Sequence, residues 1–530
     1  MKINQDSSSK IYLVGSGIAS LASAVYFIRD AGIRGENISI LEQDATAGGA
    51  LDGKGDPEHG FIARGGRMHE QHFVCYWDLL SGIPSATDPA KSVTEESFEF
   101  SKRFTSRSQS RLIKEAKVLD VSSYGLRLQD KFDIIRLTVT PEKLLGNKAI
   151  QDWFSHKFFE TNFWKIWESM FAFQKWSSLA EMRRYFLRFM HLFPQLHELG
   201  GIYRTVYNQY DSVIVPLQTW LKECGVKFNF GTQVTDIDFS ITDSTKTATA
   251  IHCTEKGIQK IILLSEEDYV FITNGSIAES TDTGSMTRPA IQKTKGTSGA
   301  WTLWECIASK DPAFGHPGVF SNQIDLQKWV SFTVTLHDPT FLRHLSATYG
   351  YIPGVSGLMT ITDSNWLLSI VVAAQPHFAN QPANVDIFWG YGLYQDKPGN
   401  FVQKRMQDCS GEEILTELFS HLEITGKMKP VLDAGKVNCR PTIMPFIDSE
   451  FMPRTQGDRP DVVPAGATNF AFLGEFSEVR NDCVFTVEYS VRTAQTAVYT
   501  HFETGKHILP VYIGGHKVRS LINAVIAMSR

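Results

Sequence analysis

Residues 10–42 alternate apolar and polar positions in a way that predicts a strand, a helix and a second strand in direct succession. Residues 11–14 form a short apolar run, residues 21–30 follow a helical pattern, and residues 38–41 form a second apolar run. Short apolar runs bounded by turn residues are typical of buried strands, and their alternation with a helix is typical of a parallel sheet. This part of the chain is therefore predicted to form a β-α-β unit.

Small residues stand where the first predicted strand turns into the helix. Gly15, Gly17 and Ser20 have the spacing G-x-G-x-x-S, and Glu42 follows the second strand. Gly15 permits a tight turn, Gly17 lets backbone N–H groups approach a pyrophosphate, and Ser20 still allows close helix–strand packing in place of the usual third glycine. Glu42 is placed to accept hydrogen bonds from ribose hydroxyls. The unit predicts a dinucleotide site; the alternative is a turn that only serves packing.

Two further glycine-rich loops, at residues 48–49 and 64–67, help to decide which dinucleotide is bound. A carboxylate at Glu42 would repel the extra phosphate of NADP, which leaves NAD and FAD. Many flavoproteins place glycine loops against the cofactor after this acid, whereas nicotinamide enzymes usually continue with more strand–helix units. The loops favour FAD, and the alternative is that they are ordinary surface turns. Further residues expected around FAD are Gly48, Gly49, Arg64, Gly65, Gly66, Arg67, Asn274, Gly275 and Gly474.

The same hydrophobic patterns return later, after long interruptions. We expect an α/β fold in which a discontinuous FAD-binding, Rossmann-like domain is combined with a β-rich substrate domain and a helical segment rich in aromatic residues. Further predicted elements are a helix over 212–224, strands at 226–230, 234–237, 269–274, 329–336, 366–372 and 469–473, and a helix over about 486–500. Residues 70–80 are also expected to be helical.

The predicted elements divide the chain into domains. Nine aromatic residues between positions 154 and 176 are either ordinary core or the wall of an apolar cavity. The expected boundaries are 10–135, 212–299 and 436–504 for the FAD-binding domain, 136–211 for the helical cavity segment, 300–435 for the substrate domain and 505–530 for a C-terminal amphipathic segment.

Composition narrows the class of protein. The chain has 530 residues, and its 42% hydrophobic and 21% charged residues are typical of a soluble globular protein. A net charge of −5 gives no support for a nucleic-acid partner. The seven cysteines form no C-x-x-C pair and no zinc spacing, so we expect reduced thiols, no metal site and a cytoplasmic protein. The sequence shows no apolar signal region and no run of about 18 apolar residues.

Residues 64–85, RGGRMHEQHFVCYWDLLSGIPS, resemble a motif of the bacterial oleate hydratases, once called myosin-cross-reactive antigens. That family adds water across the cis double bond of free unsaturated fatty acids, converting oleate into 10-hydroxystearate. It binds FAD although the net reaction transfers no electrons. The resemblance implies a hydro-lyase whose partners are FAD, an unsaturated fatty acid and water. Other matching stretches are NFWKIWESMFAF (162–173), EMRRYFLRF (181–189), YNQYDSVIVPL (207–217), FITNGSIAES (271–280), GDRPDVVP (457–464) and VFTVEYSVRTAQTAVY (484–499).

The resemblance assigns the role of proton donor to Tyr185. Hydration of an isolated alkene needs a strong acid at one carbon and an aligned water at the other, with positive charge developing between them. The family's tyrosine matches Tyr185 in EMRRY. Arg183 and Arg184 adjoin it, and we expect nearby cations to favour loss of the phenol proton. Without the motif, packing would be the ordinary explanation of this tyrosine.

The residue after RGGR departs from the family. Most members have a water-activating glutamate there, whereas this chain has Met68, which cannot accept a proton. In the hypothesis we favour, Glu70 or His69 activates the water after a small shift of the loop. Alternatively, backbone groups and the flavin hold the water, or the protein is slow or acts on another substrate. Glu70 and His72 could instead simply support the loop.

The segment expected to bind the substrate carboxylate departs as well. Many relatives carry polar side chains before the proline of an M-P-(Y/F) motif, where this chain has Val437 and Ile443. Asn438, Arg440 and Thr442 are the candidates to replace them, since a guanidinium can bind a carboxylate through two parallel hydrogen bonds. An exposed salt bridge is the ordinary alternative for Arg440.

The two ends of the chain carry further expectations. Dimeric relatives have a longer extension before the first strand, and about ten residues precede it here, so we expect a monomer. A C-terminal apolar stripe, flanked by basic residues, either docks on the protein or contacts an anionic bilayer from which fatty acids would enter. Its members are Val518, Leu521, Ile522, Val525 and Ile526, and the basic residues are Lys517, Arg519 and Arg530.

Two other functions stay open at this point. A redox flavoenzyme acting on an apolar substrate, such as a desaturase or oxidase, would show bleaching of the flavin by substrate. Hydration, in contrast, leaves the flavin redox state unchanged over the cycle. A non-catalytic lipid-binding flavoprotein would bind oleate without turnover, an alternative suggested by Met68.

Overall fold

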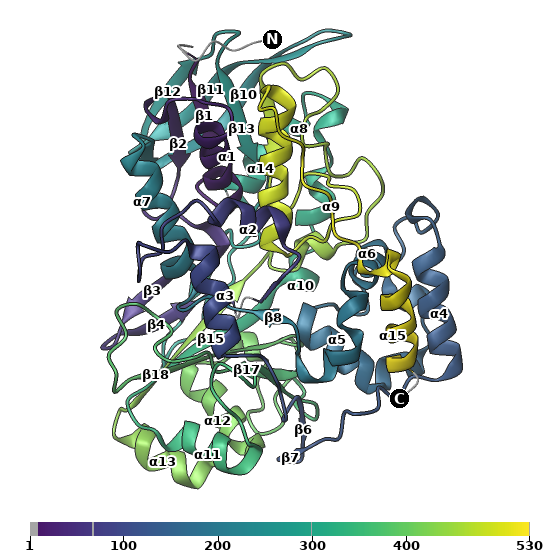
Figure 1. Ribbon diagram of the computed structural model, residues 1–530. Helices are drawn as coiled ribbons and strands as arrows, with labels where there is room; N and C mark the ends of the chain where they lie inside the picture. The colour runs from purple at the N-terminus through teal and green to yellow at the C-terminus, as the bar shows by residue number, and fades with distance from the viewer. Residues whose placement is uncertain (1–8, 66–67, 298, 529–530) are drawn as a thin grey trace.

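Two large sheets and a lobe of helices make up the protein (Figure 1). The computed structural model describes residues 9–65, 68–297 and 299–528. In the view of Figure 1 the parallel sheet lies in the upper part, the mixed sheet in the lower part, and the helical lobe on the right. The predicted α/β fold is confirmed.

The parallel sheet has five strands that come from three separate stretches of the chain. All neighbouring strands run parallel. Helices α1 (Ile18–Arg29) and α14 (Val487–His501) lie side by side on it. Strands buried on both faces are typical of such sheets, which explains the unbroken apolar runs. The order is β20 (Phe470–Leu473), β13 (Tyr269–Thr273), β1 (Ile11–Val14), β2 (Ile38–Glu42) and β9 (Lys227–Phe230).

The mixed sheet has eight strands, with helices α11 (Thr340–Tyr349), α12 (Gly411–His421) and α13 (Thr425–Asp433) beside it. Its strand order is β14 (Asp282–Thr283), β19 (Val437–Met444), β15 (Trp329–Leu336), β18 (Asp386–Gly392), β17 (Leu368–Val371), β16 (Leu358–Ile361), β6 (Leu112–Lys114) and β7 (Lys117–Val118).

Pairing in the mixed sheet differs from the expected boundaries. Strand β19 is antiparallel to β15 from Val437 to Met444, although a boundary at residue 435 separates the two. Strands β6, β7 and β14 also join this sheet from stretches assigned to the FAD-binding domain. Hydrogen bonding between strands that are far apart in sequence decides which sheet each strand joins. Such pairing leaves no pattern in the neighbouring residues from which it could be predicted.

Smaller sheets and the remaining helices connect these parts. The expected helix over residues 70–80 begins only at Val74, because His69–Glu70 form a strand, β5, that pairs with β8 (Ile202–Tyr203). The other strands are β3 (Gly53–Asp56), β4 (Gly60–Ala63), β10 (Thr232–Ile241), β11 (Lys246–Glu255) and β12 (Ile258–Leu263). The other helices outside the lobe are α2 (Val74–Leu80), α3 (Val93–Arg103), α7 (Val215–Glu223), α8 (Gly299–Ala308), α9 (Pro317–Ser321) and α10 (Ile324–Gln327).

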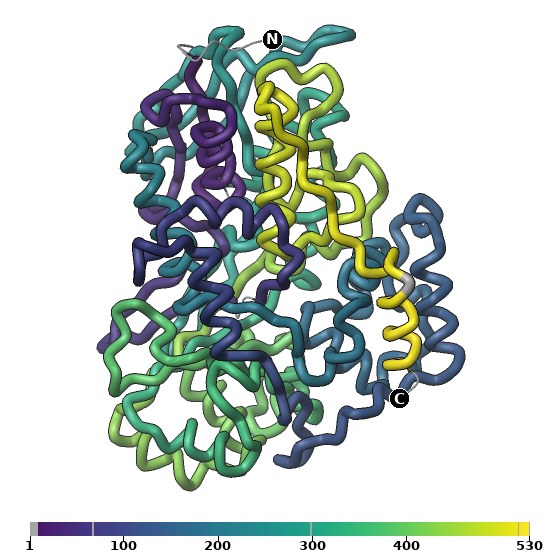
Figure 2. Tube along the Cα trace, in the orientation of Figure 1, coloured from purple at the N-terminus to yellow at the C-terminus, as the bar shows by residue number. Residues whose placement is uncertain are grey.

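The helical lobe contains the aromatic-rich segment. It consists of α4 (Leu128–Val139), α5 (Asn162–Phe171), α6 (Leu179–Phe189), the 3₁₀ segment η6 (Met190–Glu198) and α15 (Val518–Met528). Its rings pack on one another: Phe163 stacks on Trp167 with centroids 5.6 Å apart, and Trp167 contacts Phe186 at 4.8 Å. Figure 2 shows the C-terminal end of the chain crossing from the parallel-sheet side to this lobe.

The C-terminal helix α15 leaves its larger apolar side chains exposed. Ile522 and Ile526 are each 54% exposed, whereas the small Ala524 and Ala527 are buried. Docking through the predicted stripe is therefore not what holds this helix to η6. Among the described residues, we find no helix with the length and apolar character needed to cross a bilayer.

Candidate functional site

A cavity of about 970 Å³ opens at the carboxyl ends of the parallel strands. In open sheets of this kind, ligands bind outside these strand ends. The turns after β1, β2, β13 and β20 all reach its wall. Residues on the wall that the sequence predicted for FAD are Gly15, Gly17, Glu42, Gly48, Gly49, Arg64, Asn274, Gly275 and Gly474.

The first glycine turn leaves room at the backbone. Gly15 has φ +85°, a left-handed conformation that side chains rarely adopt. A Cβ placed on Gly17 would meet no atom within 4 Å, so open space borders the backbone at the start of α1. The Gly48 N–H donates to the Ser16 carbonyl at 3.0 Å, which holds the second glycine loop against the first. A pyrophosphate can therefore approach the N-terminus of α1 closely.

Glu42 is fixed by the turn it faces. Its Oε2 accepts hydrogen bonds from the Ser16 N–H at 2.8 Å and from the Ser16 hydroxyl at 2.6 Å, and its Oε1 accepts from the Asp44 N–H at 2.8 Å. Burial raises the pKa of Glu42 despite these bonds. A carboxylate has about four lone-pair sites, so Glu42 keeps capacity for ribose hydroxyls. Sequence reasoning missed Ser16, although its place between the two glycines is a usable signal.

Asn274 tests whether the cavity suits a dinucleotide. Its side chain lies on the wall, and its Nδ2 and Oδ1 are buried without a partner among the described residues. Buried polar atoms are nearly always paired in proteins, so this amide is expected to bind a polar ligand. With the glycine turn and Glu42, the cavity fits a dinucleotide such as FAD.

Two of the residues predicted for the cofactor, Ser20 and Gly65, do not line this cavity. Ser20 is fully buried, with its Oγ 3.2 Å from Thr273 Oγ1, behind the loop and not on the cavity. Gly65 lines a second cavity. Gly66 and Arg67 lie outside the described residues. Arg64 lines both cavities and forms an ion pair with Asp52 at 2.8 Å.

The second cavity is largely apolar, and the helical lobe and the mixed sheet contribute to its wall. Arg64, Phe485 and Val487 line both cavities, so the two meet there. All four residues predicted for catalysis reach its wall: Met68, His69, Glu70 and Tyr185.

Tyr185 lies on α6 and is 1% exposed. Its hydroxyl donates to the Val484 carbonyl at 2.6 Å, and the rings of Phe171 and Phe189 lie 5.0 and 5.4 Å away. Burial, helped by nearby acidic groups such as Cys483, raises the pKa of Tyr185 well above its usual value. The expectation that neighbouring arginines ease loss of the phenol proton is therefore wrong. Tyr185 remains a protonated donor through the neutral pH range.

Buried ion pairs hold α6 in place. Glu181 pairs with Arg454 and Arg459, each at 2.8 Å, and Arg184 pairs with Glu142 at 2.8 Å and Glu478 at 2.7 Å. Because Arg184 is committed to these carboxylates, it does not serve the Tyr185 phenol. Removing one partner of such a buried pair is strongly destabilising, so the network fixes where Tyr185 points.

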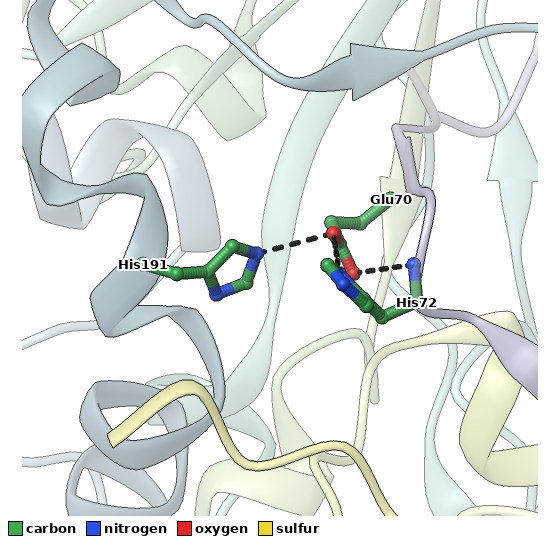
Figure 3. A group of neighbouring side chains, drawn as sticks. All are labelled: Glu70, His72 and His191. Carbon is green, nitrogen blue, oxygen red and sulfur yellow. Dashed lines mark hydrogen bonds and ion pairs between the residues drawn. The ribbon is translucent and has the colours of Figure 1, made fainter. Parts of the chain in front are cut away.

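Glu70 is tied to two histidines (Figure 3). Its Oε1 lies 2.5 Å from His72 Nδ1 and 3.1 Å from His191 Nε2, and its Oε2 lies 3.6 Å from Arg188 Nη1. Burial alone would raise the pKa of Glu70, but hydrogen bonds from His191 and His72 and the charge of Arg188 lower it to about 2. Glu70 is therefore ionised and weakly basic, suited to accept a hydrogen bond from water.

His69 occupies a different setting. It is 1% exposed, its Nε2 lies 2.8 Å from Gln209 Nε2, and its ring stacks on Tyr76 with centroids 4.8 Å apart. His69 is therefore held firmly on the wall beside Met68. Sequence reasoning missed Gln209, His191 and Arg188; Gln209 stands in the matching stretch 207–217, and Arg188 in 181–189.

The candidates for the substrate carboxylate are not on the apolar cavity. Asn438, Arg440 and Thr442 belong to β19, which lies between β14 and β15. Arg440 donates from Nε to the Gly284 carbonyl at 3.0 Å and from Nη1 to the His59 carbonyl at 2.8 Å. The structure thus does not bring this group to the cavity. Polar residues that do lie on its wall include Arg204, Thr205, Asn208, Gln209 and His377.

Comparisons with known proteins agree with the resemblance. Residues 8–499 match the model of the MCRA family. An oleate hydratase of Streptococcus pyogenes is 41% identical over 97% of this chain and 88% of the relative. A linoleate hydratase of Lactiplantibacillus plantarum is 33% identical over 93% of each. The solved cyclohexylamine oxidase of Brevibacterium oxydans, at 12% identity and TM-score 0.55 over 94% of this chain and all of that one, shares the fold.

Substitution of Gly17 by valine is expected to weaken the affinity for flavin by at least about 100-fold. The new side chain would fill the space that a pyrophosphate needs, and it would leave the fold intact because its Cβ meets no atom within 4 Å. Flavin absorbance retained after gel filtration measures the effect. Gly82→Val is the matched control, since a Cβ there is equally unobstructed. Full flavin content in the Gly17→Val protein would contradict the assignment.

Proposed function

We propose, because the chain belongs to the MCRA family, that it is an FAD-containing hydro-lyase that hydrates the cis double bond of free unsaturated fatty acids, oleate to 10-hydroxystearate among them. The observation that carries the proposal is the contact between the two cavities. Tyr185 and Glu70 line an apolar cavity that meets the dinucleotide cavity at Arg64, Phe485 and Val487. An acyl chain in the first would lie against the second.

In the proposed reaction Tyr185 protonates one alkene carbon. Burial raises the pKa of Tyr185, which keeps the phenol protonated but makes it a weaker acid, so the step depends on stabilisation of the positive charge that develops on the alkene. Positive charge then develops on the other carbon, where aromatic rings such as Phe171 and Phe189 offer electron-rich faces. Water bonds to this carbon and releases a proton, which restores the phenol and leaves a net uptake of one water. FAD, when bound, would supply a planar polar surface beside the alkene, without net electron transfer.

Water must be held on the side of the cavity formed by residues 68–70. Met68 offers no acceptor for a proton, whereas Glu70 is an ionised carboxylate on the same wall. We assign Glu70 to orient the water and His69 to assist from its fixed position. General base assistance is worth about 10² to 10⁴ in rate, so weak basicity at Glu70 predicts a slower enzyme than relatives with the usual glutamate.

Binding of the acyl carboxylate falls to different residues from those first considered. Arg204, Asn208 and His377 reach the cavity wall, and burial lowers the pKa of His377 to about 4. His377 is therefore neutral at physiological pH and would donate a hydrogen bond to a carboxylate without adding charge. Asn438, Arg440 and Thr442 remain candidates only if the acyl chain extends beyond the cavity seen here.

Replacing Tyr185 by phenylalanine is expected to lower kcat for oleate hydration by about 10² to 10⁴, with KM nearly unchanged. The change removes the proton donor and one hydrogen bond to the Val484 carbonyl, and keeps the ring. Mass spectrometry of the hydroxystearate product measures the rate. Tyr391→Phe is the control, because Tyr391 lines the same cavity and also donates to a backbone carbonyl, that of Ser169. Equal rates for the two variants would refute the assignment.

The helical lobe also presents an apolar surface that suits a membrane. On α4 the exposed side chains are Leu128, Phe132, Ile135 and Val139, spaced by three or four residues, while Asp130 and Asp133 are buried. Helix α15 adds Leu521, Ile522 and Ile526, with Lys517 and Arg519 exposed nearby. Both helices belong to the lobe (Figure 1). Apolar ridges flanked by cations favour an anionic bilayer, from which fatty acids would reach the cavity.

We further propose that the protein is a cytoplasmic monomer that contacts the membrane peripherally. All seven cysteines are free thiols, which is usual in a reducing compartment. The molar mass from light scattering should be that of one chain, 59.5 kDa, and a mass of twice this value would refute the monomer.

Paired substitution of Ile522 and Ile526 by glutamate is expected to reduce sedimentation with anionic vesicles several-fold, because each change removes apolar area and adds negative charge. Hydration of dispersed oleate should stay near the wild-type rate. Ile258→Glu is the control, since Ile258 is 65% exposed on β12, outside the lobe. Unchanged vesicle binding in the paired variant would rule out this surface.

A further inference from the structure

Glu70, His72 and His191 point toward one another and form a close cluster (Figure 3). Their potential ligand atoms all lie within 4.8 Å of one another. Glu70 comes from β5, His72 from the turn after it, and His191 from the start of η6, 121 residues away. Glu70 lines the apolar cavity although its side chain is only 3% exposed. The side chains of His72 and His191 are 25% and 11% exposed and do not line that cavity.

The geometry of the cluster favours a hydrogen-bonded unit over a metal site. One ring nitrogen of each histidine approaches the same carboxylate oxygen, Oε1. The backbone N–H of His72 donates to the other oxygen, Oε2, at 2.9 Å. Arg188 lies 3.6 Å from Oε2, and a fixed positive charge there opposes a divalent cation. The carboxylate is thus held by donors on both oxygens.

Residues 512–515, which precede α15, pack against this cluster. The ring of Tyr512 stacks on His72 with centroids 3.6 Å apart and an interplanar angle of 12°, and it meets His191 edge-on at 5.1 Å. Two glycines allow the close approach: a Cβ on Gly514 would lie 2.7 Å from His191 Nδ1, and one on Gly515 would lie 3.0 Å from a methyl of Leu187. Larger residues at these positions would push the segment away.

We propose that Glu70, His72, His191 and Tyr512 act as one unit that orients the attacking water. Glu70 accepts a hydrogen bond from the water in the cavity, and the other three are positioning residues that fix its carboxylate and keep it ionised. The proposal rests on the hydration reaction proposed above. It makes the C-terminal segment part of the active site, in addition to any contact of α15 with a membrane.

Charged groups around the unit set the sign of its pH dependence. Arg188 faces Glu70 from α6, Asp482 lies 3.9 Å from Arg188, and Lys517 lies 4.6 Å from the Tyr512 ring centroid. The two imidazoles and Arg188 lower the pKa of Glu70 from 4.5 to about 2, against burial, which raises it. Removing a donor must therefore raise this pKa, and activity is then lost on the acid side first.

The test is the pH profile of kcat for oleate in the full-length holoenzyme. Wild type should show no loss between pH 8 and 5, because Glu70 stays ionised there. His191→Leu, which removes a donor to Glu70, should lose at least about tenfold in kcat at pH 5 and recover to within about threefold of wild type at pH 8. Tyr512→Ala, which removes the ring that stacks on His72, should show a smaller loss on the same acid side. The KM for oleate should stay unchanged. His191→Gln, which keeps an N–H donor, and Tyr512→Phe, which keeps the ring, should restore the profile.

Several results would overturn the proposal. These are an equal loss at all pH values, a change in KM alone, or the same acid loss in the control His337→Leu, whose exposed imidazole lies 3.0 Å from the Pro57 carbonyl, away from Glu70 in the chain. Dependence of activity on a metal, shown by loss with a chelator and recovery with zinc, would replace the unit by a metal site.

A second measurement separates failure of this unit from failure of the hydration reaction. Histidine-selective ¹⁵N NMR of wild type and Glu70→Gln reports the hydrogen bonding of His72 and His191 without turnover. Loss of the carboxylate should shift the ring-nitrogen signals of both imidazoles, because each loses its contact with Oε1. Tyr512→Ala should shift the His72 signal more than the His191 signal, because Tyr512 stacks on His72. Unchanged histidine signals in Glu70→Gln would refute the unit even if hydration occurs. The predicted shifts without hydration in wild type would refute only the reaction.

Discussion

The contact between the two cavities is the constraint on which the rest of the structure depends. Arg64 borders both and is held by Asp52 and by the Gly49 carbonyl, which belong to the loop after β2. Phe485 and Val487 reach both from the start of α14. Because each of these groups is anchored in the parallel-sheet domain, this boundary is where, among the described residues, an apolar ligand and a dinucleotide can meet. The helical lobe and the mixed sheet close the apolar side.

Helix α6 carries the polar chemistry to that boundary. Tyr185, Arg188 and, after the helix, His191 are three residues apart in succession, so they share one face of the helix and its extension. This face must keep one group protonated and another ionised, and the two groups have separate partners. Tyr185 donates to a backbone carbonyl, whereas Arg188 and His191 face the Glu70 carboxylate. Buried ion pairs of Glu181 and Arg184, each four residues before one of these side chains, hold the helix in place. A protonated donor and an ionised acceptor can thus coexist in one apolar cavity.

The parts predicted correctly from sequence are those with a local signal. The strand–turn–helix unit with Gly15, Gly17 and Glu42 needs only neighbouring residues, and the structure forms it as expected. The fold class and the family followed from motifs of this kind. Membership of β19 in the mixed sheet, which removes Asn438, Arg440 and Thr442 from the cavity, depends on pairing with a distant strand.

Other features had no local signal at all. The pairing of Glu70 with His191 and the stacking of Tyr512 on His72 join residues far apart in the chain. The pattern of α4 shows that it is amphipathic, but only the tertiary structure shows that Asp130 faces inward and Phe132 outward. Likewise, adjacency to two arginines in sequence did not reveal that burial controls the pKa of Tyr185.

The most direct test of hydration at this boundary is to incubate the FAD-loaded protein with oleate in ¹⁸O-labelled water and determine the product by mass spectrometry. The account predicts hydroxystearate that carries one ¹⁸O atom, with the flavin spectrum the same before and after turnover. Unlabelled product, or bleaching of the flavin in proportion to substrate consumed, would show redox chemistry and contradict it. Binding of oleate without formation of any product would indicate a non-catalytic lipid-binding protein.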